Sequence, residues 1–109
     1  MAGKTERYIK AKIEEDLIKQ LTEKNTIQEY YIDLVRDYIS FWEMKNSLIK
    51  DIKSRGVSIS FISREGQEGY KKNDSLAELV KVNAQMLKIL TDLGLRAAEL
   101  EAVEADEEL

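Results

Sequence analysis

The first twelve residues contain the clearest candidate for a charge-based binding site. Four bases, Lys4, Arg7, Lys10 and Lys12, are accompanied there by a single acid. Lys4, Arg7 and Lys10 are spaced three apart, so on a helix they share one edge. Such an edge can lie along a phosphate backbone, where affinity comes mainly from neutralised charge. We therefore expect these four bases, helped by Lys19, to contact nucleic-acid phosphates.

A second basic group occurs between residues 50 and 72. Its members are Lys50, Lys53, Arg55, Arg64, Lys71 and Lys72. They have two interpretations: a second phosphate-binding surface, or charges that offset a helix dipole and keep the surface soluble. No zinc-finger, aromatic RNA-binding or recognition-helix motif accompanies either group. Nucleic-acid contact would therefore rely on backbone and shape rather than on base edges.

Catalysis has little chemical support in this sequence. The chain has no His and no Cys, and it lacks a glycine-rich phosphate loop. The acidic run Glu14-Glu15-Asp16 would need to converge on a metal, yet consecutive helical residues point in different directions. We expect no catalytic residue, no metal site and no cofactor. A carboxylate-dependent metal nuclease remains the enzymatic alternative, to be tested by metal-dependent cleavage.

Length and charge point to one small domain with an acidic end. The chain has 109 residues, a net charge of −4, and six acids with no base in residues 99–109. We divide it into a helical oligomerisation and DNA-binding domain, residues 1–95, and an acidic tail, residues 96–109. No apolar run is long enough to cross a membrane, and the start lacks a signal-peptide core. We expect a cytoplasmic protein with no membrane partner.

The stretch from residue 27 to residue 55 predicts one long central helix. Apolar residues recur seven apart at Ile27, Leu34, Phe41 and Leu48, with no Gly or Pro between. An unbroken helix here would be roughly 43 Å long at 1.5 Å per residue. The spacing also predicts a helix over residues 5–24. A capping box of Thr26 and Glu29 makes the join short, which predicts an antiparallel helical hairpin.

The rest of the chain predicts a small β element and a third helix. Gly56 is expected to end the long helix in the left-handed conformation. Residues 57–62 alternate apolar and small polar side chains, and a return strand can begin at Tyr70, giving a β-hairpin or extended arm near residues 57–71. A second capping box, Ser75 with Glu78, starts a helix that Gly94 closes. The predicted fold is mainly all-α.

The central helix carries more large apolar side chains than one hairpin partner can cover. Tyr31, Tyr38, Phe41 and Trp42 occupy more than one of its faces. Large residues left uncovered usually form an interface. We therefore predict that these four residues join neighbouring copies of the chain. The competing interpretation is a compact three-helix monomer with the Tyr hydroxyls at its edge.

Two ordered stretches carry a family resemblance. They are Asp33-Leu34-Val35-x-Asp37-Tyr38, continuing from Trp42-x-Met44-Lys45-Asn46 to Gly56-Val57-Ser58, and Gly69-Tyr70-Lys71-Lys72-Asn73-Asp74-Ser75, continuing to Leu93-Gly94-Leu95. Together, over about residues 30–95, they resemble the small subunit of phage terminases. The resemblance implies a non-enzymatic packaging component that recognises the packaging start site on viral DNA. It also implies assembly into rings and loading of DNA onto the large subunit, which carries the ATPase and nuclease.

The resemblance completes the predicted set of partners. They are double-stranded viral DNA, the large terminase subunit and further copies of the chain in a homo-oligomeric ring, all in the cytoplasm of a bacterial host. The acidic tail is expected to contact the large subunit or to stay free. The alternative is a structural or regulatory helical adaptor without DNA binding. A dimer with no DNA affinity at low salt would favour that alternative.

Overall fold

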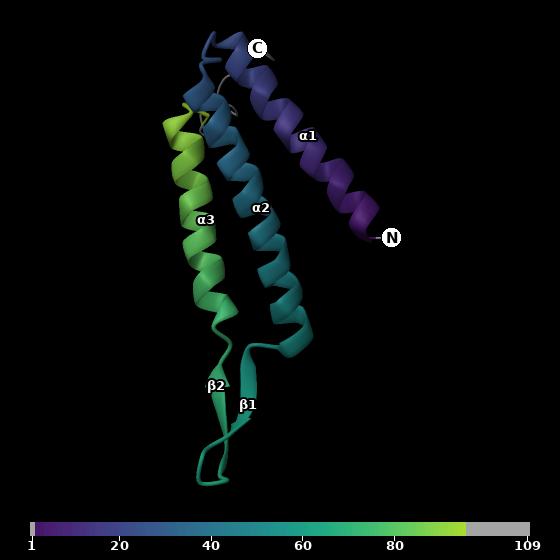
Figure 1. Ribbon diagram of the computed structural model, residues 1–109, viewed down its shortest axis with the longest axis vertical. Helices are drawn as coiled ribbons and strands as arrows, with labels where there is room; N and C mark the ends of the chain where they lie inside the picture. The colour runs from purple at the N-terminus through teal and green to yellow at the C-terminus, as the bar shows by residue number, and fades with distance from the viewer. Residues whose placement is uncertain (1, 96–109) are drawn as a thin grey trace, which may run out of the picture.

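The computed structural model describes residues 2–95, with side chains from residue 5 onward (Figure 1). The elements in chain order are α1 (Ala2–Glu23), α2 (Glu29–Arg55), β1 (Ser58–Ile62), β2 (Glu68–Lys72) and α3 (Ser75–Asp92). The predicted mainly helical fold, with a long central helix and a small hairpin, is confirmed. The acidic tail and the side chain of Lys4 lie outside the described residues, and the domain division remains a prediction.

The long helix α2 is the element on which the others pack. α3 lies alongside it, while α1 runs in the opposite direction and diverges from it toward the N-terminus (Figure 1). One core cluster, near the α1–α2 turn, consists of Leu17, Leu21, Val35, Ile89, Leu93 and Leu95. A second, further along α2, consists of Trp42, Val82 and Met86. The apolar core therefore holds the C-terminal half of α1 and leaves its N-terminal half at the edge.

The turn between α1 and α2 differs from its predicted capping. Asn25 adopts a φ of 59°, the left-handed conformation that ends a helix. Thr26 does not cap α2: its amide and its Oγ1 both donate to the carbonyl of Leu21, at 2.9 and 3.2 Å. Gln28 stands at the N-cap and makes no side-chain cap bond. The predicted capping box is wrong because Thr26 closes α1 instead.

The ends of α2 and α3 nearest the hairpin also depart from prediction. Gly56 has φ 84° and ψ −178°, so its φ is positive, but it lies outside the left-handed helical region, in one that essentially only glycine adopts. Asp74 occupies the N-cap of α3 and Ser75 lies inside the helix, so the second capping box is wrong too. The Ser75 hydroxyl donates to Asp51 at 2.6 Å, and Asn73 Oδ1 accepts the Ser75 amide at 3.0 Å. The side chain that caps the start of α3 is therefore that of Asn73, not that of Asp74 or Ser75.

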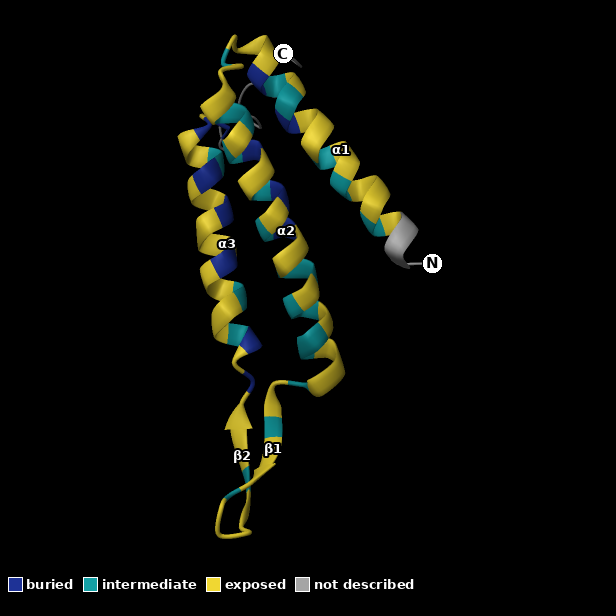
Figure 2. Ribbon diagram, in the orientation of Figure 1, coloured by how far each residue is buried: buried dark blue, intermediate teal, exposed yellow. Residues whose placement is uncertain are grey.

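The hairpin forms an arm, residues 58–72, that extends beyond the ends of α2 and α3 (Figure 1). Its antiparallel register pairs Ser60 with Tyr70 and Phe61 with Gly69. The second strand begins at Glu68, two residues before the predicted start. A Cβ at Gly69 would lie 3.0 Å from the Phe61 ring, so the ring covers this glycine. Most of the arm is exposed (Figure 2), which is unusual for a two-stranded sheet, because such sheets are marginal alone.

Candidate nucleic-acid interface

A polar cleft of about 300 Å³ lies between α1 and α2. Its lining comprises Glu6, Arg7 and Lys10 from α1, and Trp42, Glu43, Asn46, Ser47 and Lys50 from α2. Three of these eight residues are bases and two are acids. The cleft lies where α1 has left the apolar core, so its walls are held by polar contacts. A polar wall with a surplus of positive charge suits a phosphate-bearing ligand.

Two ion pairs cross the cleft in opposite senses. Lys10 Nζ lies 2.8 Å from Glu43 Oε1, and Lys50 Nζ lies 2.6 Å from Glu6 Oε1. Each helix supplies one base and one acid. All four side chains are at least one-third exposed, so each pair contributes about 0.2–1 kcal/mol. Contacts this weak help to position α1, and they leave both lysines able to exchange a carboxylate for a phosphate.

The structure distributes the predicted DNA-binding residues over two faces of α1. Arg7 and Lys10 line the cleft. Lys12 and Lys19 are exposed and, seven residues apart, share a different face. The backbone of Lys4 lies in the first turn of α1. Their assignment to DNA remains a prediction, and the described members form a band around α1 rather than one edge.

Local surroundings make these bases unequal. Lys19 has Glu15 and Glu23 four residues away on either side, in reach of its charge. Toward the N-terminus, the first turn of α1 contains no acid, so the positive end of the helix dipole adds to Arg7 and its neighbours. The exposed Tyr8 stands in the same segment. The positive potential is therefore concentrated in the first three turns.

The second basic group does not form one surface. Lys50 joins the cleft, a role the sequence did not indicate because 40 residues separate it from Lys10. Arg55 is held at Asp51. The remaining members, Lys53, Arg64, Lys71 and Lys72, are exposed at the end of α2 and on the arm. Both interpretations of those four remain open.

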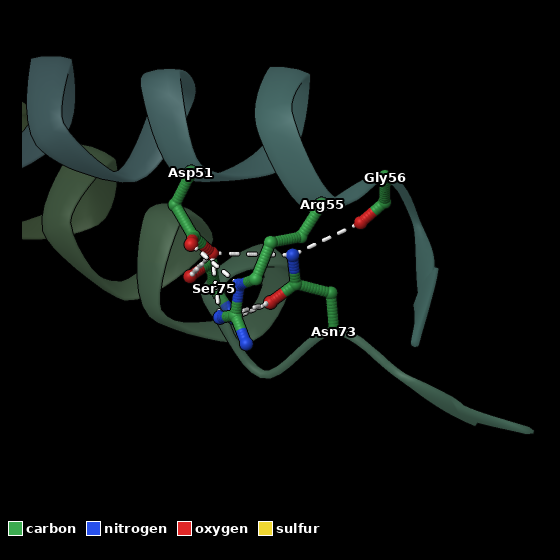
Figure 3. Close-up of polar contacts among 5 residues, drawn as sticks. All are labelled: Asp51, Arg55, Gly56, Asn73 and Ser75. Atoms are coloured by element: carbon green, nitrogen blue, oxygen red, sulfur yellow. Dashed lines mark hydrogen bonds and ion pairs between the residues drawn. The ribbon is translucent and has the colours of Figure 1, made fainter. Parts of the chain in front are cut away.

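A polar network at the base of the arm was missed in the sequence (Figure 3). Asp51 Oδ2 accepts bonds from the Ser75 hydroxyl at 2.6 Å and from Asn73 Nδ2 at 3.2 Å. Asn73, 1% exposed, also donates to the Gly56 carbonyl at 2.9 Å. The guanidinium of Arg55, with the Ser75 hydroxyl, holds the pKa of the Asp51 carboxyl far below its ordinary value. The network fixes the arm to both helices, and only the spacing of Asp51 and Arg55 signals part of it in advance.

The predicted interface residues contribute mainly to the core of the single chain. Trp42 is 8% exposed and packs with Val82 and Met86. Tyr31, Tyr38 and Phe41 are half-buried against the same clusters, and burial raises the pKa of Tyr38. These three keep part of their surface accessible, and their role in an interface remains a prediction.

Larger apolar exposures occur at positions outside the predicted interface. Tyr30, Met44, Val80 and Leu87 are all more than half exposed, as are Ile62 and Tyr70 on the arm. The heptad spacing within a single helix could not separate these residues from core residues, because burial depends on which helices pack against each other.

Among residues 2–95, the structure places no three His, Cys, Asp or Glu side chains together as a metal site, and no helix is long and apolar enough to cross a membrane.

Comparison with known families supplies a match along most of the chain. The family described as phage terminase, small subunit, matches residues 12–108. The match leaves the first eleven residues outside, and with them Lys4, Arg7 and Lys10. Neither the curated proteins nor the solved structures gave a match.

Proposed function

Because the chain belongs to the family of phage terminase small subunits, with a role in phage DNA packaging, we propose that it recognises viral DNA at the packaging start site. It then delivers that DNA to the large terminase subunit. The chain itself is not an enzyme in this proposal, since the large subunit supplies the ATPase and nuclease. Both subunits act in the cytoplasm of the bacterial host.

The observation that supports DNA contact is the positive first half of α1 together with its cleft. Arg7 and Lys10 meet Lys50 there, across the gap from α2. Lys4 and Lys12 add charge to the same segment of the chain. Phosphate neutralisation by such residues gives salt-dependent affinity without base reading. Lys19 contributes least, because acids flank it.

We further propose that copies of the chain assemble into a ring. The exposed parts of Tyr31, Tyr38 and Phe41 form the contact with the next copy, and Trp42 supports them from the core. Residues 1–95 act as one oligomerisation and DNA-binding domain. The acidic tail, residues 96–109, contacts the large subunit. Removing the tail should then weaken large-subunit binding and leave DNA affinity intact.

DNA binding is tested by fluorescence anisotropy with a labelled duplex over a series of salt concentrations. The test variant replaces Lys4, Arg7, Lys10 and Lys12 by Gln. Each lost phosphate contact lowers the slope of log affinity against log salt by about 0.9, so we expect the four substitutions together to lower it by about 3.6 and to weaken binding strongly.

A matched variant removes the same charge elsewhere, replacing Lys53, Arg64, Lys71 and Lys72 by Gln. It should keep most of the affinity. The opposite ranking would move the DNA surface to the arm and refute the α1 assignment. Absence of DNA binding by the unmodified protein at low salt, with light scattering that shows a dimer, would favour the adaptor alternative.

A further inference from the structure

The outer face of α3 lacks charged side chains. This helix contains four, Glu78, Lys81, Lys88 and Asp92, and at 100° per residue all four fall on one flank. The face opposite the buried Val82 and Ile89 presents the uncharged residues Leu76, Ala77, Val80, Asn83, Ala84, Leu87 and Thr91. In a chain with 35% charged residues, a solvent-facing helix surface of this composition marks a contact site.

Exposure confirms that nothing in the described chain covers this face. Val80 is 69% exposed and Leu87 is 66% exposed. α3 lies at one edge of the molecule, with α2 between it and α1 (Figure 1). Ala77 and Ala84, seven residues apart, carry side chains small enough for another helix to approach closely. The face is therefore flat and accessible along the helix.

The spacing of the larger residues is that of a helix-pairing seam. Leu76, Val80, Asn83, Leu87 and Leu90 follow each other at intervals of four, three, four and three. This is the repeat by which two helices pack knobs into holes. Leu76 and Leu90, at the two ends, are half-buried. One polar residue, Asn83, stands at the middle of the seam, where a buried Asn fixes register.

We propose that a second copy of this chain packs on this face, with the two α3 helices antiparallel about a two-fold axis at Asn83. Val80 lies three residues before Asn83 and Leu87 four residues after it. The rotation therefore sets Val80 of each copy against Leu87 of the other. The Asn83 amide group has both donor and acceptor, so it pairs with its symmetry mate.

Charge complementarity selects the antiparallel direction. Residues 20–37, at the α1–α2 turn, hold four acids and two bases, a net charge of −2. Residues 50–72, at the arm end, hold six bases and three acids, a net charge of +3. A two-fold axis at the middle of α3 places the acidic end of one copy beside the basic end of the other.

This contact is separate from the ring contact proposed for α2, and its tests need no DNA. The chain has no Cys, so single cysteine variants report proximity directly. Under mild oxidation, Asn83→Cys should form a disulfide-linked dimer on a non-reducing gel. Gln85 is exposed on the charged flank, so Gln85→Cys is the matched control. It should show no disulfide-linked dimer on the same gel. Equal cross-linking of both variants would show that the disulfides form by random collision and would count against the proposed contact.

A mixing experiment tests the direction. Val80→Cys chains mixed with Leu87→Cys chains should give the mixed dimer by intact mass, at several times the yield of either variant oxidised alone. A Val80→Cys dimer that forms as readily alone would show a parallel or unrelated contact and overturn the proposal.

A charge-insertion pair gives an independent readout by light scattering. Val80→Glu with Leu87→Glu should lower the assembly mass by at least a factor of two, while Gln85→Glu should not. Both positions are exposed, so circular dichroism should show unchanged helix content. The proposal would be refuted if the unmodified protein stays monomeric at high concentration. In that case either residues 96–109 cover the outer face of α3 or nothing does.

Discussion

Arg55 follows Asp51 by one turn of α2, and its guanidinium binds both oxygens of that carboxylate, through Nε at 2.6 Å and Nη2 at 2.7 Å. This bidentate ion pair leaves Asp51 Oδ2 able to accept further hydrogen bonds from the Ser75 hydroxyl and the Asn73 amide. The end of α2, the base of the arm and the start of α3 are thus joined at one carboxylate. The arm therefore projects in a fixed direction.

Asn73 is the residue of this network whose loss should cost the most stability. It is 1% exposed, and its amide bonds both Asp51 and the Gly56 carbonyl. Asn73→Ala leaves buried groups without partners, which costs about 1–3 kcal/mol. Urea unfolding should show this loss, while Asn46→Ala, at the half-exposed cleft, should change the free energy of unfolding by less than about 0.5 kcal/mol. Equal losses would contradict the network's role.

Acid should weaken the fold through Asp51. The pKa of its carboxyl is lower in the folded chain than in the unfolded chain, where it is about 3.9. The network therefore contributes fully above that pH and loses its contribution as the pH falls further. Asp51→Asn should be less stable than the unmodified protein at pH 7, and the two should converge in strong acid. Thermal unfolding from pH 7 to pH 2 measures this, and parallel curves would disprove it.

Trp42 should behave as a core residue in the single chain. It is 8% exposed and packs on Val82 and Met86, so Trp42→Ala should cost about 3–5 kcal/mol. Tyr38 is half-buried, so Tyr38→Ala should lower the free energy of unfolding less than Trp42→Ala does. It should weaken assembly more. Denaturant unfolding combined with light scattering separates the two effects. A Trp42→Ala protein with unchanged unfolding but lost assembly would make Trp42 an interface residue alone.

Removing Glu43 should strengthen DNA binding. Its carboxylate holds Lys10 at 2.8 Å in an exposed pair, and breaking a pair worth about 0.2–1 kcal/mol frees the ammonium group for phosphate. We expect Glu43→Gln to bind duplex DNA about 1.5- to 5-fold more tightly. Glu29→Gln makes the same charge change at the far end of α2 and serves as the control. Identical effects of the two variants would assign the gain to net charge.

Gly69 should be required for the packing of the Phe61 ring on the arm. An added Cβ would lie 3.0 Å from the Phe61 ring, so Gly69→Ala must displace that ring. Since Phe61 is already 42% exposed, the displacement should change global stability by less than about 0.5 kcal/mol. Amide chemical shifts of residues 58–72 should nevertheless move, and those of Ser60→Ala should move much less. Unchanged arm shifts in Gly69→Ala would refute the packing.

The periodic features of the sequence predicted the fold well, because they need no knowledge of the neighbours. The rows through Leu34 and Phe41, the Asn25 break and the alternation before Phe61 each give the right element. The two capping boxes failed for different reasons: Thr26 closes the preceding helix α1, while Ser75 bonds a residue of another helix. Thr26 and Ser75 each found a partner, in Leu21 and Asp51, that lies outside the local motif.

The candidate site was only partly predictable. Basic spacing placed Arg7 and Lys10 together correctly, but Lys50 joins them only because α1 folds back along α2. The same limit applies to burial. A heptad pattern shows that Trp42 and Leu87 belong to apolar stripes, yet packing alone makes one 8% exposed and the other 66% exposed.

The order of the elements along the chain has a consequence for folding speed. α1 packs on α2, β1 pairs with β2, and α3 returns to α2 after a short arm. Contacts between near neighbours in sequence require little loop closure before they form. The monomer should therefore fold in microseconds to milliseconds, the range of helical domains rich in local contacts. Association of folded chains, as proposed above, depends on concentration and would then be the slower step.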